Sequence, residues 1–324
     1  MARYGITVPL KGSLASHKEI YRELVDLGYT DVWSAEADGV DGFTPLALAA
    51  AWAPELRLGV AIIPAFTRGP ALMAQSAASL ADAAPGRFVM GIGSSSNVIV
   101  ERWNGIPFVE PYKQTRDMVR FMKTAFEGEK VTETYDSFDI KGFRLGVKPE
   151  QAPPILVAAL RPGMLRMAGR EGDGAIINWL SADDVSTVAP IVHDAATKAG
   201  KPAPEIAARI FVCPSADADT VRAQARFAIA AYLNVPVYAA FHEWLGRGDA
   251  LAGMWENWKA GDRKAALAAI PDEVVDDLVI HGSPEHCREQ IGRYVENGVD
   301  TPAIAVMGFA GVDPIQGMRD LAPA

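Results

Sequence analysis

Short apolar runs alternate with amphipathic stretches along almost the whole chain. An uncharged apolar run that ends in small or polar residues is typical of a parallel strand buried on both faces. Such runs predict strands at 3–10, 31–35, 56–63, 87–92, 154–160, 174–179, 207–212 and 302–307. Apolar residues at helical spacing, with proline near several starts and glycine after several ends, predict helices between them. These lie at 17–27, 43–53, 70–83, 110–127, 162–171, 182–199, 217–232 and 284–297.

This repeated alternation of strand and helix predicts an α/β fold of the closed (β/α)8 class, the TIM barrel. Residues 131–147 alternate like a hairpin and residues 234–277 look mainly helical, so we expect insertions after strands 4 and 7. No polar linker divides the chain, which predicts a single domain over 1–324. The alternative is a doubly wound open sheet, but the first strand–helix turn, Leu10-Lys11-Gly12-Ser13, lacks its glycine fingerprint.

The loop after the fourth predicted strand is the main candidate for a ligand site. There Gly91-Ile92-Gly93 runs into Ser94, Ser95, Ser96 and Asn97. Small residues let backbone N–H groups approach an anion, and hydroxyls add further hydrogen bonds. In a barrel this loop lies at the C-terminal ends of the strands, where functional groups gather. An ordinary polar loop explains the same residues equally well, because Gly-x-Gly alone is a weak signal.

Composition excludes some classes of binding partner and indicates where in the cell the protein works. The 324 residues carry a net charge of −9, which argues against nucleic acid or an anionic membrane as a partner. No apolar run reaches the roughly 18 residues of a membrane span, and no signal peptide is evident at the N-terminus. Cys213 and Cys287 form no Cys-x-x-Cys motif, so we expect reduced thiols and a cytoplasmic protein. No spacing of His, Cys and Asp predicts a metal site.

Several motifs occur in a characteristic order. Trp33-Ser34-Ala35-Glu36 closes the second predicted strand, Leu58-Gly59-Val60-Ala61-Ile62-Ile63-Pro64 forms the third, and Gly282-Ser283-Pro284-Glu285 comes near the end. Together with the serine loop, they resemble the bacterial luciferase-like superfamily over almost the whole chain. The resemblance is closest to its deazaflavin (coenzyme F-420)-dependent oxidoreductases, relatives of methylene-tetrahydromethanopterin reductase and of the glucose-6-phosphate dehydrogenase that uses this cofactor.

The resemblance implies a barrel that holds a deazaflavin at its C-terminal mouth. A bulge with a non-prolyl cis peptide in the third strand would support the ring, and the matching bond joins Ala61 and Ile62. The cofactor phosphate would lie on the loop of Gly93, Ser94, Ser95 and Ser96.

Other positions at the mouth follow from the same resemblance. Ala159, Leu160 and Arg161 would line the cofactor, and Arg161 would pair with its phosphate or acidic tail. Glu36 would lie near the ring and act as general acid or base, or hold the ring; an ion pair at a strand end is the alternative.

Two further groups are candidates at the mouth. Asn178 and Trp179 would contact cofactor or substrate, although core packing accounts equally well for Trp179. Arg68 and Arg102 could steer an anionic ligand.

Two departures from the family pattern bear on the substrate. Ala37 stands where the sugar-phosphate dehydrogenases have histidine, and Ser96 where they have glutamate. These differences argue against an alcohol substrate oxidised with those groups.

The resulting hypothesis is an oxidoreductase that moves a hydride between coenzyme F-420 and a small organic substrate. One alternative is a monooxygenase that uses reduced FMN, and another is a non-catalytic flavin-binding barrel. Relatives are often dimers, so the hypothesis allows for a homodimer.

Overall fold

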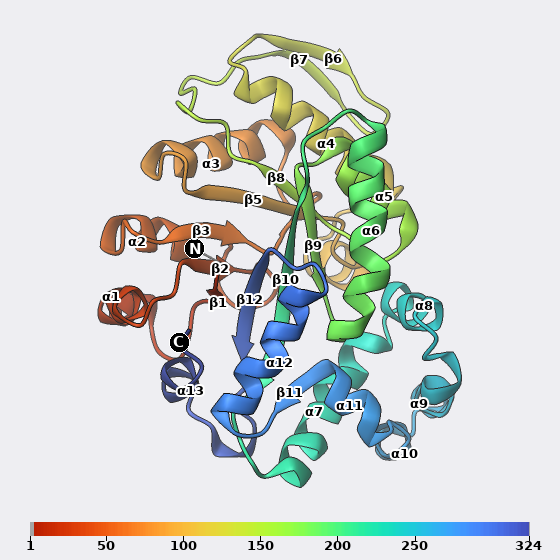
Figure 1. Ribbon diagram of the computed structural model, residues 1–324. Helices are drawn as coiled ribbons and strands as arrows, with labels where there is room; N and C mark the ends of the chain where they lie inside the picture. Colours follow the sequence, from red (N-terminus) through yellow and green to blue (C-terminus); the bar gives the residue numbers. More distant parts are fainter. Residues whose placement is uncertain (1–2, 324) are drawn as a thin grey trace.

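A computed structural model describes residues 3–323 and has a closed barrel of eight parallel strands (Figure 1). In chain order the barrel strands are β1 (Gly5–Thr7), β2 (Asp31–Ser34), β3 (Arg57–Val60), β5 (Phe88–Gly93), β8 (Ile155–Ala158), β9 (Gly174–Asn178), β10 (Glu205–Cys213) and β12 (Thr301–Val306). Each strand pairs with the next, and β12 pairs with β1 to close the ring. The predicted TIM barrel is therefore confirmed.

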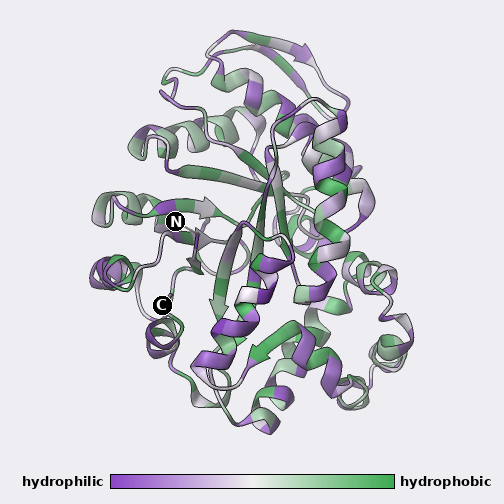
Figure 2. Ribbon diagram, in the orientation of Figure 1, coloured by the Kyte–Doolittle hydropathy of each residue, from purple (hydrophilic) through white to green (hydrophobic). Residues whose placement is uncertain are grey.

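Helices surround this barrel and pack their apolar faces on it. They are α1 (Lys18–Asp26), α2 (Thr44–Trp52), α3 (Pro70–Ala83), α4 (Pro111–Phe126), α5 (Pro162–Glu171), α6 (Ala182–Lys198), α7 (Ala218–Leu233), α12 (Pro284–Glu296) and α13 (Pro314–Asp320). Short helical turns are η1 (Leu14–His17), the π-helix η2 (Val98–Trp103) and η3 (Phe309–Gly311). Figure 2 shows hydrophobic strands in the centre and hydrophilic residues on the outer faces of the helices. The largest buried cluster lies between strands and helices, as the period of each element requires.

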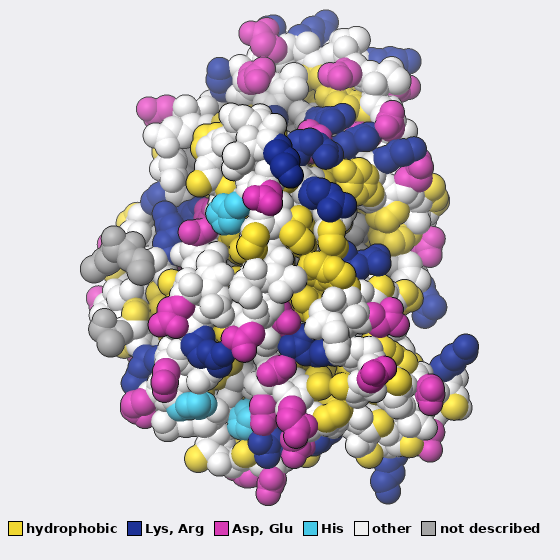
Figure 3. All heavy atoms as spheres, turned by 45° about the vertical axis from the view of Figure 1, so that its right-hand side comes forward, with side chains coloured by type: hydrophobic (Ala, Val, Ile, Leu, Met, Phe, Trp, Pro, Cys, Tyr) yellow, Lys and Arg dark blue, Asp and Glu magenta, His cyan; other side chains and the backbone are white. Residues whose placement is uncertain are grey.

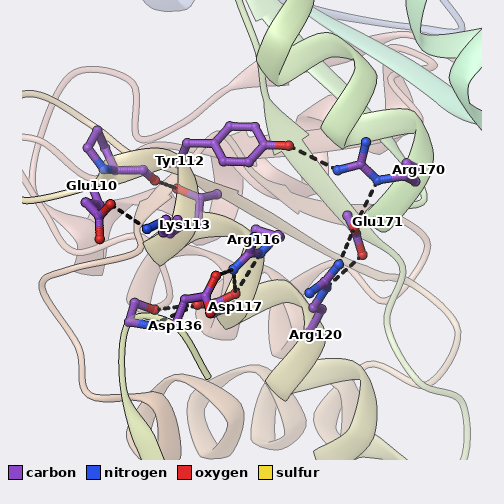
Figure 4. A network of polar contacts seen from close by, with 12 residues as sticks. Glu110, Tyr112, Lys113, Arg116, Asp117, Arg120, Asp136, Arg170 and Glu171 are labelled. Atoms are coloured by element: carbon purple, nitrogen blue, oxygen red, sulfur yellow. Dashed lines mark hydrogen bonds and ion pairs between the residues drawn. The ribbon is translucent and has the colours of Figure 1, made fainter. Parts of the chain in front are cut away.

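The first insertion follows α4 and is the antiparallel hairpin of β6 (Val131–Thr134) and β7 (Asp139–Phe143). Figure 4 shows ion pairs that join α4 to the hairpin and to α5. Arg116 of α4 contacts Asp136 of the hairpin at 2.7 Å, and Arg120 of α4 contacts Glu171 of α5 at 2.8 Å. The Tyr112 hydroxyl accepts a hydrogen bond from Arg170 of α5 at 3.0 Å.

The second insertion follows α7. It consists of α8 (Pro236–Trp244), α9 (Gly248–Ala260), α10 (Arg263–Ala268) and α11 (Asp272–Leu278). These helices share a second apolar core with α7 and the end of β10. Figure 3 shows hydrophobic side chains gathered in a strip below a group of Lys and Arg on the side that faces right in Figure 1. No helix between residues 3 and 323 is long and apolar enough to cross a bilayer.

Two features differ from the elements that the sequence predicts. A short strand, β11 (Val279–His281), pairs in parallel with β10 outside the ring of eight; its three residues are too few to show a period. The third predicted strand is interrupted, because β3 ends at Val60 and the ladder resumes at β4 (Ile63–Pro64), which pairs with β5.

Inside the barrel the side chains form layers. The lowest layer is charged: the Arg57 guanidinium donates to Glu205 at 2.7 Å and to Asp31 at 3.3 Å. Above it lies a buried apolar layer that fills the barrel from wall to wall. Its members are Trp33, Val89, Leu156, Ile176, Ala207 and Ala303.

Candidate active site

The buried apolar layer fills the barrel, and above it several side chains at the strand ends are partly exposed. Side chains two residues further along each strand face the same interior. On β8, β9 and β10 these are Ala158, Asn178 and Arg209, and all three are partly exposed, whereas the layer below is buried. Ala61 and Gly91 supply the opposite wall. Most of these residues are Gly or Ala, so the strand ends carry little side-chain bulk at the barrel mouth, which is called the cup below.

One wall of the cup is the break in the third strand. The peptide bond between Ala61 and Ile62 is cis, as the resemblance predicted. The N–H of Ala61 donates to the Ser34 carbonyl at 2.7 Å, and the N–H of Glu36 donates to the Ile62 carbonyl at 3.3 Å. These bonds hold the break against β2. Both Ala61 and Ile62 are partly exposed and pack on the interior apolar layer, so their upper surface is open to a ligand.

The close approach of β3 and β5 depends on glycine. A Cβ on Gly91 would lie 1.7 Å from the Val60 carbonyl oxygen, and one on Gly93 would lie 2.8 Å from the Ala158 Cβ. No larger residue fits either position without movement of the neighbouring strand. The paired glycines therefore bring the end of β5 tightly against both neighbours and leave the mouth free of side chains at this point.

The three serines after β5 have different surroundings. Ser96 lies two residues before η2: its carbonyl accepts from the Val100 N–H at 2.9 Å and its hydroxyl from the Ile99 N–H at 3.4 Å. Ser94 and Ser95 are partly exposed, and their hydroxyls have no hydrogen-bond partner within residues 3–323. Ser95 has a φ of 62°, in the left-handed region. The structure thus leaves the hydroxyls of the first two serines free for a ligand, while Ser96 caps a helical turn.

The residues after β8 form the next part of the rim. Ala159 is buried and its N–H donates to the Ile176 carbonyl at 3.0 Å, whereas Leu160 is partly exposed. Arg161 is the exposed N-cap residue of α5, whose first turn begins with Pro162. The Arg161 side chain forms no ion pair with any described residue. Its assignment as a partner for a cofactor phosphate stays a prediction, as do those of Ala159 and Leu160.

Glu36 lies just beyond β2 and is bound by several donors. Its carboxylate accepts two hydrogen bonds from Arg68, at 2.6 and 2.7 Å, and one from the Gly42 N–H at 3.0 Å. The Arg68 guanidinium also lies over the Phe43 ring at 5.1 Å from the centroid. The ion pair that the sequence offered as an alternative for Glu36 is thus present. It places Arg68 at the rim and fixes the orientation of the carboxylate.

Asn178 and Trp179 point in different directions. Asn178 faces the cup and its Oδ1 accepts from the Tyr238 hydroxyl at 3.3 Å. Trp179, with a φ of 52° and only 2% exposed, stacks on Phe211 at 4.0 Å between ring centroids, in the core shared with the second insertion. Core packing describes where Trp179 lies. A contact between its ring and a cofactor stays a prediction.

Two residues of the site are not predicted from the sequence. Arg209 lies inside the apolar run of β10, and its position two residues after Ala207, on the face of the strand toward the barrel interior, is the only signal for it in the sequence. Tyr238 belongs to the second insertion, and no local pattern places it over Asn178. No group of three or more metal-ligating side chains occurs within residues 3–323.

Comparisons with known proteins agree with this architecture. The chain is 26% identical to the 5,10-methylenetetrahydromethanopterin reductase of Methanolobus tindarius over 84% of each protein. It is 32% identical to the coenzyme F-420-dependent glucose-6-phosphate dehydrogenase of Kineococcus radiotolerans over 57% of this chain and 58% of that protein. The solved structure of the coenzyme F-420-dependent tetrahydromethanopterin reductase of Methanopyrus kandleri shares the fold, with a TM-score of 0.83 at 19% identity, over 99% of this chain and 97% of that one.

The chain also matches a protein family as a whole. The match covers residues 2–301, which include seven of the eight barrel strands, the cis bond, the serine loop and both insertions. The chain therefore belongs to the family of luciferase-like monooxygenases.

Proposed function

We propose that this protein is an oxidoreductase that transfers a hydride between coenzyme F-420 and a small organic substrate. The observation that carries the proposal is the barrel mouth beside the Ala61–Ile62 cis bond, where the residues are mostly small and partly exposed. A flat ring needs such an opening, which a fully packed barrel end would not leave. Support comes from the glucose-6-phosphate dehydrogenase and the tetrahydromethanopterin reductase that are named for this cofactor, whose substrates, a sugar phosphate and a pterin derivative, differ from each other.

Different residues at the barrel mouth would bind the cofactor and handle the proton. Ala61, Ile62 and Gly91 would support one face of the ring, and the free hydroxyls of Ser94 and Ser95 would hold the phosphate of the tail, with Arg161 beside it. When bound, the deazaflavin supplies the carbon that gives or takes the hydride. Glu36 would accept a proton or hold Arg68 against the substrate.

A titration tests the cofactor. Purified protein is titrated separately with oxidised coenzyme F-420 and with FMN, and the change in cofactor fluorescence is followed. We expect saturable binding of the deazaflavin and no comparable binding of FMN. The reverse result would overturn the proposal in favour of a monooxygenase that uses reduced FMN. Turnover with no compound of a substrate panel, despite tight binding, would favour a non-catalytic flavin-binding barrel.

Paired serine variants test the site itself. Ser94→Ala and Ser95→Ala remove hydroxyls that have no partner in the protein, so both should weaken binding of the cofactor and leave stability unchanged. Ser96→Ala removes the cap of η2 and serves as the matched control. If Ser96→Ala weakens cofactor binding as much as the other two, the assignment of the phosphate to Ser94 and Ser95 is wrong.

A further inference from the structure

Arg209 is a cation inside the barrel with no counter-charge. It lies in the middle of β10 with its side chain toward the interior, two residues above Ala207 of the apolar layer. Its Nε atom is buried and has no hydrogen-bond partner, and no carboxylate within residues 3–323 forms an ion pair with it. Arg209 is partly exposed, but a guanidinium nitrogen that is buried without a partner destabilises a fold, so its presence needs an explanation.

The other interior arginine shows what a structural role looks like here. Arg57, at the opposite end of the barrel, is bound by Glu205 and Asp31. Burial on its own would lower the pKa of Arg57, but the hydrogen bonds and charge of Glu205 and Asp31 raise it above its usual value. Burial lowers the pKa of Arg209, and no carboxylate opposes that effect. The fold thus compensates one guanidinium and leaves the other uncompensated.

The surroundings of Arg209 are neutral and contain further donors. Its guanidinium lies over the Phe211 ring, 5.2 Å from the centroid, and its backbone pairs with Asn178 of β9. Because Asn178 Oδ1 already accepts from Tyr238, its Nδ2 amino group remains available to donate. Burial raises the pKa of Tyr238 to about 12, so this phenol stays neutral at physiological pH. Arg209 and Asn178 therefore present N–H donors, and no negative group, to the cup.

The place of Arg209 in the ring of strands separates it from the predicted cofactor tail. Around the barrel the order is β3, β5, β8, β9, β10, β12, β1 and β2. β10 is four strands from β3 in either direction, so Arg209 lies across the cup from the Ala61–Ile62 bond. The loops assigned to the phosphate follow β5 and β8, which are three and two strands from β10. A ring seated at the cis bond would leave Arg209 facing the space that remains for substrate.

We propose that Arg209, with the Asn178 amide beside it, binds an anionic oxygen group of the substrate, such as a carboxylate or phosphate. The inference rests on the proposed function and deepens it by naming the substrate class. Charge-assisted hydrogen bonds from a guanidinium fork suit such groups. The anion would supply the counter-charge that the protein lacks at this point.

The test uses the cofactor-free protein and needs no turnover. Binding of acetate, oxalate and inorganic phosphate is measured by calorimetry for wild type, Arg209→Met and the control Arg144→Met, an exposed arginine of the first insertion with 61% of its side chain accessible. We expect at least one anion to bind wild type and Arg144→Met equally and Arg209→Met at least about tenfold more weakly, as loss of a charged hydrogen bond implies. Equal binding by Arg209→Met would overturn the proposal.

Stability gives an independent readout. Arg209→Met removes a cation whose Nε is buried without a partner, so its urea midpoint should equal or exceed that of wild type. A clearly lower midpoint would assign Arg209 to structure and would contradict the proposal.

A titration with coenzyme F-420 shows whether the anion that Arg209 binds belongs to the substrate or to the cofactor. Saturating cofactor should leave the anion affinity of wild type intact, and Arg209→Met should retain cofactor affinity. If cofactor displaces the anion, or if Arg209→Met loses cofactor affinity instead of anion affinity, Arg209 serves the cofactor and the substrate proposal fails. If wild type binds anions as expected but no coenzyme F-420, the proposed function fails while the anion site stands.

Discussion

The pair of Glu36 and Arg68 allows a quantitative test of the rim. Both side chains are largely buried, with 15% and 17% of their surface accessible, and two hydrogen bonds of 2.6 and 2.7 Å join them. Exposed ion pairs contribute about 0–1 kcal/mol, whereas hydrogen bonds to charged groups contribute about 1.5–3 kcal/mol. We therefore expect a coupling free energy of about 2 kcal/mol between the two residues.

A double-mutant cycle measures this coupling. Glu36→Gln, Arg68→Met and the double variant are unfolded in urea and followed by fluorescence and circular dichroism. Glu36→Gln should cost about 2–3 kcal/mol, because it leaves the Arg68 cation against Phe43 without a carboxylate. Glu256→Gln, an exposed change on α9, should cost less than about 0.5 kcal/mol. A coupling below about 0.5 kcal/mol would show that solvent screens the pair, and the reasoning would be refuted.

The same variants separate two roles for Glu36. If Glu36 acts only by holding Arg68, both single variants and the double variant should lose turnover to the same extent. If Glu36 itself moves a proton, Glu36→Gln should lose more turnover than Arg68→Met, with the cofactor dissociation constant nearly unchanged in both.

Three further predictions concern stability and reactivity. Burial lowers the pKa of His242 to about 3, so below pH 6.5 the unfolded chain binds a proton that the folded protein does not bind. The free energy of unfolding should therefore have its full value above pH 6.5 and fall by about 2 kcal/mol between pH 7 and pH 5. In urea unfolding, His242→Gln should make the free energy of unfolding less dependent on pH over this range. Gly91→Ala places a Cβ 1.7 Å from a backbone oxygen and should cost about 3 kcal/mol or more, whereas Gly163→Ala, with open space around it, should be neutral or stabilising; equal urea midpoints would contradict this. Cys213 and Cys287 are buried, and burial raises their thiol pKa values to about 11 and about 12, so both should resist a thiol reagent in native protein and react in urea; fast native labelling would show that one is accessible.

The strands and helices of this barrel follow from local pattern. Parallel strands buried on both faces give uninterrupted apolar runs, and surface helices give a period of 3.6, so both are visible within a window of about ten residues. The serine loop could be located in the same way, because glycine and serine mark the end of β5 directly. The cis bond between Ala61 and Ile62 came from family resemblance, since no local pattern of residues indicates it.

The chemistry of the mouth was decided by tertiary structure. Arg68 reaches Glu36 across 32 residues, and Tyr238 reaches Asn178 across 60, so neither contact leaves a periodic trace in the sequence. Whether Arg209 has a counter-charge depends on which strands flank β10 and on their register, and Trp179 is buried against Phe211 of β10 and Tyr232 of α7, which are distant in sequence. Local period records which face of an element is buried, but it carries no information about which distant side chain lies on the other side.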